Sequence, residues 1–199
     1  RNWWLALIVA AAVSCVVGCR DAAPPASSLI ADDHDPAGWP RVFTDDLGVE
    51  VTVDGPPQRI VSISPGMTEI IFALGEGDRL VGVTDFCDYP PEAAEKERIG
   101  GMTNPSIERI VGLDPDLTLI ARGAPIEVVK ALRGSGLPVI GKSAAALADV
   151  IEQVRDIGEY LGVEEQAARM ADGLEQRVSV VRRSVVPQRA DYLQSSGRC

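Results

Sequence analysis

The sequence predicts an α/β fold in which a doubly wound parallel sheet is followed by a long helix. Short apolar runs, typical of strands that are buried on both faces, alternate with amphipathic helical segments between residues 59 and 161. Strands separated in this way by helices pair in parallel. A further helical pattern covers residues 164–186, and at 1.5 Å per residue it would be roughly 35 Å long.

The predicted elements follow one another in a regular order. Residues 41–53 alternate around an Asp-Asp-Leu-Gly turn, which predicts a β-hairpin. Buried strands are expected at four apolar runs, residues 59–64, 79–84, 116–121 and 137–141. Helices are expected after them, beginning at Ser64-Pro65, at Asn104-Pro105, at Pro125 and at Leu147. At the first two, a capping side chain followed by proline favours a helix start, and at Leu147 apolar residues trace one helix face. The run RADYLQSS (189–196) is expected to begin another strand.

The N-terminal forty residues are expected to lie outside the folded part. Residues 3–18 are mostly apolar but fall short of the roughly twenty residues that span a bilayer, and they match a secretory signal. The segment ends in Val-Val-Gly-Cys, similar to a bacterial lipobox, so Cys19 is the expected lipid attachment site. The alternative is a plain signal peptide with a chance cysteine. We assign residues 1–18 to a lipoprotein signal peptide and residues 19–40, rich in Ala, Pro, Ser and Asp, to a disordered tether.

Composition and motifs exclude several function classes. The formal net charge of −10 disfavours contact with phosphate backbones, so no nucleic-acid partner is expected. The single histidine, His34, excludes His-based triads and most zinc sites. Cys87 and Cys199 are too isolated to form a metal or redox framework, and a disulfide between them stays open. The turn SPGMTE lacks both the G-x-G-x-x-G pattern and the P-loop lysine, so an enzyme is not expected.

Four segments carry a family resemblance: QRIVSISPGMTEIIFALG, VGVTDFCDYPPEA, GGMTNPSIERIVGLDPDLTLI and LGVEEQAARMADGLEQR. Together they resemble the periplasmic binding proteins of the iron-siderophore, haem and vitamin B12 class, with the vitamin B12 receptors of ABC importers as the nearest relatives. The resemblance covers residues 41 to about 195. It implies two Rossmann-like lobes joined by a rigid helix, with the ligand held between them. Residues 41–162 then form the N-terminal lobe, 163–187 the bridging helix and 188–199 the start of a truncated second lobe.

The resemblance implies an extracytoplasmic substrate-binding lipoprotein, lipid-anchored in the periplasm or on the outer face of the cell membrane. Such a protein captures a small-molecule metal chelate and delivers it to an ABC permease and its ATPase. Cobalamin is the favoured ligand, and an iron-siderophore or haem is the alternative. A further alternative is a truncated remnant that binds little. No intrinsic cofactor and no resident metal are expected.

The candidate ligand-binding residues come from the carboxyl ends of the predicted strands, where open α/β sheets bind their ligands. Phe86 and Tyr89 are expected to stack on a flat macrocycle, or alternatively to pin their loop to the core. Met102 stands where the B12 receptors present a tryptophan, and Arg122 matches an arginine of the family, although a plain surface arginine is the alternative. The full set is Ser64, Pro65, Met67, Phe86, Tyr89, Met102 and Arg122.

Glu69 lies on the predicted helix that follows residue 64, on the side opposite its apolar positions. A charge on a solvated helix face near the N-terminus is one interpretation. The resemblance gives another, because a glutamate at this place in the family motif pairs with arginines of the permease. An exposed carboxylate of this kind would orient docking more than it would add affinity.

Overall fold

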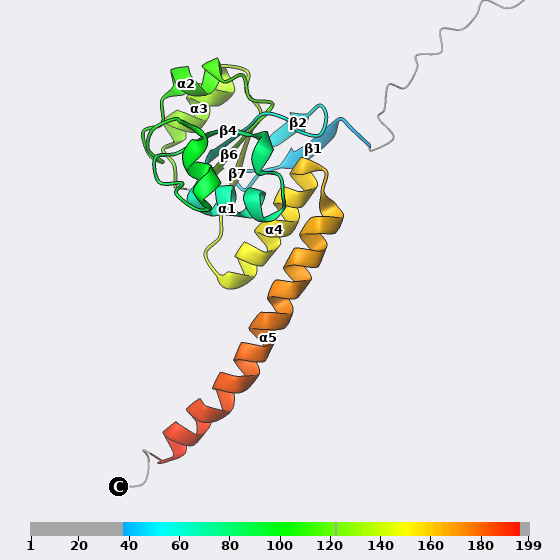
Figure 1. The fold of residues 1–199 in the computed structure, drawn as a ribbon, viewed down its shortest axis with the longest axis vertical. Helices are drawn as coiled ribbons and strands as arrows, with labels where there is room; N and C mark the ends of the chain where they lie inside the picture. Colours follow the sequence, from blue (N-terminus) through cyan, green and yellow to red (C-terminus); the bar gives the residue numbers. More distant parts are fainter. Residues whose placement is uncertain (1–37, 122, 196–199) are drawn as a thin grey trace, which may run out of the picture. The chain divides into compact units, whose positions relative to one another are not determined.

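The computed structural model describes residues 38–121 and 123–195, with side chains described as far as Ser184. Its centre is a five-stranded sheet in the order β5-β4-β3-β6-β7, with every neighbouring pair parallel (Figure 1). Four strands confirm the predicted ones: β3 (Ile60–Ile63), β4 (Leu80–Val83), β6 (Leu117–Ala121) and β7 (Val139–Lys142). The fifth strand, β5 (Glu97–Arg98), was not predicted, because two polar residues within a long connection carry no strand pattern.

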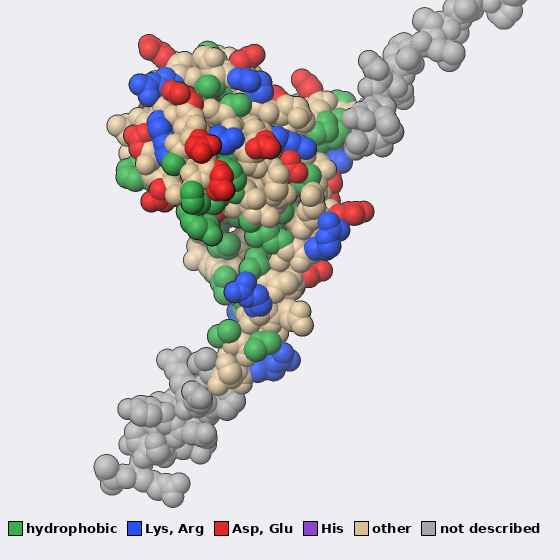
Figure 2. Space-filling model, in the orientation of Figure 1, with side chains coloured by type: hydrophobic (Ala, Val, Ile, Leu, Met, Phe, Trp, Pro, Cys, Tyr) green, Lys and Arg blue, Asp and Glu red, His purple; other side chains and the backbone are tan. Residues whose placement is uncertain are grey.

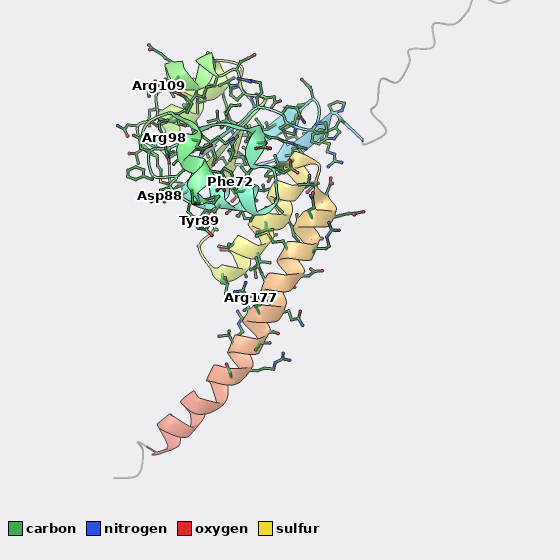
Figure 3. The ribbon with its side chains drawn as sticks, viewed as in Figure 1. Phe72, Asp88, Tyr89, Arg98, Arg109 and Arg177 are labelled. Atoms are coloured by element: carbon green, nitrogen blue, oxygen red, sulfur yellow. The ribbon has the colours of Figure 1, made fainter. Side chains whose placement is uncertain are left out.

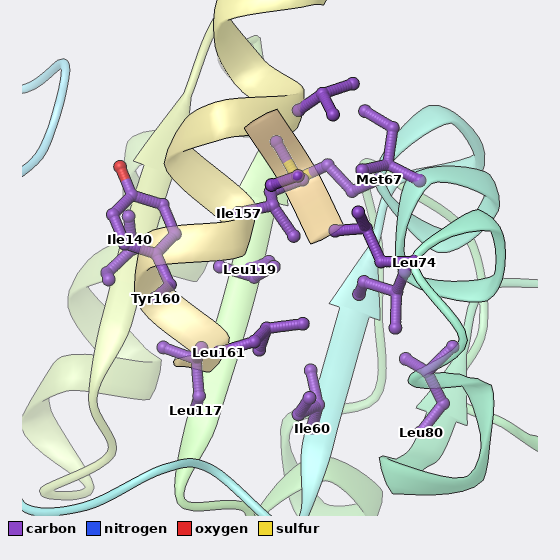
Figure 4. Close-up of a cluster of buried hydrophobic side chains, with 14 of the residues drawn as sticks. Ile60, Met67, Leu74, Leu80, Leu117, Leu119, Ile140, Ile157, Tyr160 and Leu161 are labelled. Atoms are coloured by element: carbon purple, nitrogen blue, oxygen red, sulfur yellow. The ribbon is translucent and has the colours of Figure 1, made fainter. Parts of the chain in front are cut away.

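Helices cover both faces of the sheet, as the doubly wound prediction requires. One buried cluster joins the sheet to α1 (Pro65–Ala73) and α4 (Leu147–Leu161), and Figure 4 shows part of it. A second cluster joins the opposite face to α2 (Ile107–Gly112) and α3 (Ile126–Gly134). Strand β6 serves both clusters, because Leu117 and Leu119 belong to the first and Ile120 to the second. This alternation is the two-residue period of a strand that is buried on both sides.

The predicted hairpin is present as β1 (Arg41–Thr44) and β2 (Glu50–Val53), and side chains fix it to the lobe. Asp45 in its turn accepts hydrogen bonds from the backbone N–H groups of Leu47 and Val49, both at 2.9 Å, and pairs with Arg133 of α3. Trp39 is only 1% exposed. The predicted tether of residues 19–40 is therefore wrong at its end, because one buried indole is enough to attach this segment to the core.

The long helix predicted after residue 163 is present as α5 (Glu164–Ser195). The strand predicted at 189–196 is wrong, since α5 continues through Ser195. A growing helix gains one hydrogen bond for each residue it orders, whereas a new strand needs a partner. The first turns of α5 pack closely on α4, where a Cβ atom on Gly158 would lie 2.1 Å from the Cβ of Ala167. In the part of the chain that is described, no helix is both long and apolar enough for a membrane span.

Two helix starts differ in detail from the expected caps. Helix α2 is capped by Ser106, whose side chain accepts a hydrogen bond from the backbone N–H of Arg109, and not by Asn104. Pro105 is held instead in an antiparallel bridge with Gly100. Ser64 does occupy the N-cap position of α1, with Pro65 in its first turn, but its hydroxyl makes no capping hydrogen bond.

Candidate ligand-binding site

A cavity of about 490 Å³ lies beyond the carboxyl ends of β3, β6 and β7. This is the place where ligands of open α/β sheets bind, and the volume lies within the usual range of ligand pockets. The cavity extends from these strand ends to α1, α4 and the first half of α5. Its walls are formed by Ser64, Gly66, Met67, Glu69, Ile70, Ala73, Tyr89, Ala121, Lys142, Ser143, Ala144, Val150, Gln153 and Met170.

The structure brings some of the predicted site residues together and leaves others apart. Ser64, Met67 and Tyr89 line the cavity. Pro65, Phe86 and Met102 do not line it, although Phe86 shares the loop of Tyr89. Arg122 and Cys19 lie outside the described residues.

The two loop aromatics are exposed. Phe86 is 61% exposed and Tyr89 is 65% exposed, so neither ring pins its loop to the core. In Figure 3, Tyr89 and Asp88 project from the edge of the lobe beyond α1. Large exposed aromatic side chains beside a cavity supply apolar area that a ligand can cover. Of the two interpretations from the sequence, the structure therefore excludes the packing one.

The loop that carries these aromatics is held from below by buried polar contacts. A guanidinium nitrogen of Arg98 donates to the backbone oxygens of Thr84 and Cys87, at 2.6 and 2.9 Å. The thiol of Cys87 is 1% exposed, forms no disulfide, and lies 3.3 Å from the hydroxyl of Thr68 on α1. Cys87 is therefore a small buried residue in the base of the loop. The rings therefore extend from a loop with a fixed base.

Lys142 lines the cavity, but two carboxylates already pair with its positive charge. Its ammonium group lies 2.9 Å from a carboxylate oxygen of Asp46 in the hairpin turn and 2.7 Å from one of Asp156 on α4. Burial by itself lowers the pKa of Lys142, but the hydrogen bonds to Asp156 and Asp46 outweigh that effect and raise the pKa above its usual range. Lys142 therefore stays charged and is occupied in joining β7, α4 and the hairpin.

Three lining residues on α4 and α5 were missed from the sequence: Val150, Gln153 and Met170. One signal was present for Gln153. On a helical wheel it falls about 60° from Val150 and about 40° from Ile157, on the apolar side of α4, and it is 7% exposed. A polar side chain on a buried helix face is unusual and calls for a local reason.

Glu69 is exposed on α1, as the helical pattern predicted. It lines the cavity at the strand ends and also a neighbouring hollow of about 560 Å³. The second hollow is acidic, since its other charged residues are Asp78, Glu92, Glu95 and Lys96. Figure 2 shows acidic side chains on this face of the lobe, together with apolar side chains toward α5. Within the described residues, no group of three or more His, Cys, Asp or Glu side chains is placed to hold a metal ion.

A family model described as periplasmic binding protein matches residues 60–189, which is more than half of the chain. The chain belongs to the periplasmic binding protein family. This family consists of binding proteins and not of enzymes, in agreement with the prediction from the sequence. The match covers the sheet, the cavity and most of α5.

Individual relatives and solved structures agree with this assignment. An uncharacterized ABC transporter substrate-binding lipoprotein of Bacillus subtilis is 32% identical over 86% of this chain and 54% of its own length. The crystal structure of a periplasmic vitamin B12 binding protein of Vibrio cholerae has a TM-score of 0.61 and 32% identity, over 65% of this chain and 51% of that one. A periplasmic haem-binding protein from Roseiflexus has a TM-score of 0.59 and 33% identity, over 63% and 49%. The chain thus spans about half the length of these relatives.

Proposed function

We propose that this chain forms the ligand-binding lobe of an extracytoplasmic substrate-binding lipoprotein, which delivers a metal chelate to an ABC permease and its ATPase. One observation carries the proposal. In a member of this family, the exposed ring of Tyr89 stands at a cavity of about 490 Å³ at the strand ends. Cobalamin is the favoured chelate and haem or a ferric siderophore the alternative, in keeping with relatives named for vitamin B12 and for haem.

The ligand-binding role is divided between apolar and polar groups. Tyr89 and Phe86 stack on the flat part of the chelate, because rigid rings bury much apolar area at little entropic cost. Met67 lines the cavity and gives it a deformable apolar wall. Met102 and Pro65, which do not line the cavity, supply apolar contacts to the part of the chelate that extends beyond it. Ser64 supplies a hydroxyl, and Arg122 contacts a polar substituent of the chelate.

The permease-docking role falls to Glu69. Its exposed position on α1, next to the carboxylates of Glu92 and Glu95, gives this face a negative potential. A negative patch steers a partner that presents arginines and fixes its orientation. Docking at Glu69 would hold the strand-end cavity close to the translocation path.

The membrane role falls to Cys19, as the thioether attachment point of a lipid anchor outside the cytoplasm. One acyl chain binds a membrane only weakly and reversibly, whereas several chains on one residue anchor it firmly. Growth of an expressing bacterium with radiolabelled palmitate tests this part. Label should enter the wild type and be absent from Cys19→Ala. Equal labelling of the two proteins would refute the anchor.

The ligand-binding proposal is tested by titrating the protein with cyanocobalamin, haem and a ferric siderophore. Ligand absorbance and quenching of protein fluorescence report binding. We expect saturable one-to-one binding of one chelate, with cobalamin tightest. The matched control is Val111→Ala, which truncates an exposed apolar residue on α2 and should bind as the wild type does. Failure of all three chelates to bind would overturn the proposal and favour a remnant that has lost ligand binding.

A further inference from the structure

Two polar side chains in the strand-end cavity are almost buried and have no hydrogen-bond partner among the described residues. Gln153 on α4 is 7% exposed, and no hydrogen bond of its side-chain amide exists within that part of the chain. Ser64 at the end of β3 is 8% exposed, and its hydroxyl likewise makes no bond there. Both residues line the same cavity. Buried amides and hydroxyls are normally hydrogen-bonded, so these two side chains are available to a polar group that enters the cavity.

These two groups are open to the cavity and not sealed inside the protein. The side-chain atoms that are fully enclosed and unpaired in the described chain belong to Trp39, Thr118 and Arg133. Neither Gln153 nor Ser64 is among them, so their polar atoms retain access to the space that they line. A ligand group in that space can therefore reach them without displacing any protein hydrogen bond.

The charges of the cavity disfavour an anion. Lys142 is the one described cation that lines it, and Asp46 and Asp156 hold that cation at 2.9 and 2.7 Å. Together the three groups carry a net charge of −1. Among the described residues, a ligand carboxylate would therefore find no free counter-charge in this partly buried site, and burying a charge without a counter-charge is costly.

The donors and acceptors favour a carboxamide. The side chain of Gln153 both donates and accepts, and so does the hydroxyl of Ser64. A carboxamide also has both functions, whereas an ionised carboxylate only accepts. Met67, Ile70 and Met170 add apolar wall, which suits the hydrocarbon part of such a substituent.

We propose that Gln153 and Ser64 form a subsite for a neutral carboxamide arm of the bound chelate. The subsite makes the lobe prefer ligands whose periphery carries amides over ligands that carry carboxylates. This inference rests on the proposed function, because it assigns a specificity to the same cavity. It also gives a physical reason for cobalamin, with its amide arms, to bind better than haem, with its two carboxylates.

The test compares cyanocobalamin with its three monocarboxylic acids, in each of which one propionamide is hydrolysed. Titrations at pH 7 use the wild type, Gln153→Leu, Ser64→Ala and the control Gln176→Leu, which changes an exposed glutamine of α5. For the wild type we expect one monocarboxylic acid to bind at least about tenfold more weakly than cobalamin. Gln153→Leu and Ser64→Ala should each bind cobalamin about three- to tenfold more weakly. Gln176→Leu should match the wild type.

A cycle of protein and ligand changes identifies the contact itself. If Gln153 binds the arm, substitution of Gln153 and hydrolysis of that arm both remove the same interaction. Their effects on the free energy of binding should therefore not add. Gln153→Leu should melt no lower than the wild type, because it replaces an unpaired amide with an apolar group. Equal binding of cobalamin by the wild type and both variants, or equal binding of all four ligands by the wild type, overturns this inference alone. A wild type that binds no cobalamin overturns both the inference and the cobalamin assignment.

Discussion

Truncation of Tyr89 is the sharpest test of the strand-end site. About two thirds of the side chain is exposed, at 65%. An aromatic side chain offers about 200 Å² for burial, so the exposed part corresponds to roughly 130 Å². At about 25 cal/mol per Å² this area is equivalent to about 3 kcal/mol, and contact with one face of the ring is equivalent to about half of that. Tyr89→Ala should therefore weaken chelate binding by about 10- to 150-fold.

Isothermal titration with the tightest-binding chelate measures this change. The melting temperature should stay within about two degrees of the wild type, because an exposed ring contributes little to stability. Val111→Ala again serves as the control for loss of exposed apolar area, because Val111 lies on α2, which covers the opposite face of the sheet. Tyr89→Ala that binds as tightly as the wild type, with an intact fold, would refute the placement of the ligand at this loop.

Three further predictions concern docking and stability. Glu69→Arg should abolish uptake of labelled chelate into proteoliposomes that contain the cognate permease, because it reverses a docking charge. The affinity of the protein for the chelate should stay within about threefold of the wild type. A parallel loss of affinity would contradict the docking role. Asp45→Ala should cost about 2–4 kcal/mol in chemical denaturation, because it removes the ion pair with Arg133 and the acceptor of three backbone N–H groups, those of Leu47, Val49 and Gly141. Burial by itself raises the pKa of Asp45, but hydrogen bonds from the backbone and from Arg133 outweigh it and lower that pKa below its usual range. The stabilisation by ionised Asp45 is therefore complete above about pH 4 and is lost as the pH falls further. Asp45→Ala should lack this acid-dependent loss of stability. Gly158→Val should lower the free energy of unfolding by at least about 1–3 kcal/mol, since a Cβ there meets Ala167 at 2.1 Å, and an unchanged denaturation midpoint would contradict the close packing of α4 on α5.

The larger elements of the fold could be predicted from the sequence because their signals are local. Apolar runs identified β3, β4, β6 and β7, and helical periodicity identified α4 and the first part of α5. The prediction failed where the local signal was weak or where two signals competed. Two polar residues gave no sign of β5, and both Asn104 and Ser106 are good helix caps, so only the bridge at Pro105 decides between them.

The site was predicted in part for the same reason. Strand-end position identified Ser64, Met67 and Tyr89, but the exposure of Tyr89 was undecided, because a ring that binds a ligand and one that packs on the core look alike in sequence. Gln153 was missed although it interrupts an apolar helix face. The neutralisation of Lys142 was not predictable, since Asp46 comes from a hairpin 96 positions earlier in the chain.

Hydrogen–deuterium exchange with and without cyanocobalamin tests the central claim most directly, because it locates the ligand on the chain without a substitution. Slowed exchange is expected in peptides that cover the start of α1, the loop of Tyr89, and the segment from the end of β7 into α4. The amino ends of the strands and the exposed face of α2 should exchange at unchanged rates. Protection confined to those regions, or no protection at a saturating ligand concentration, would contradict a chelate-binding surface at the carboxyl edge of the sheet.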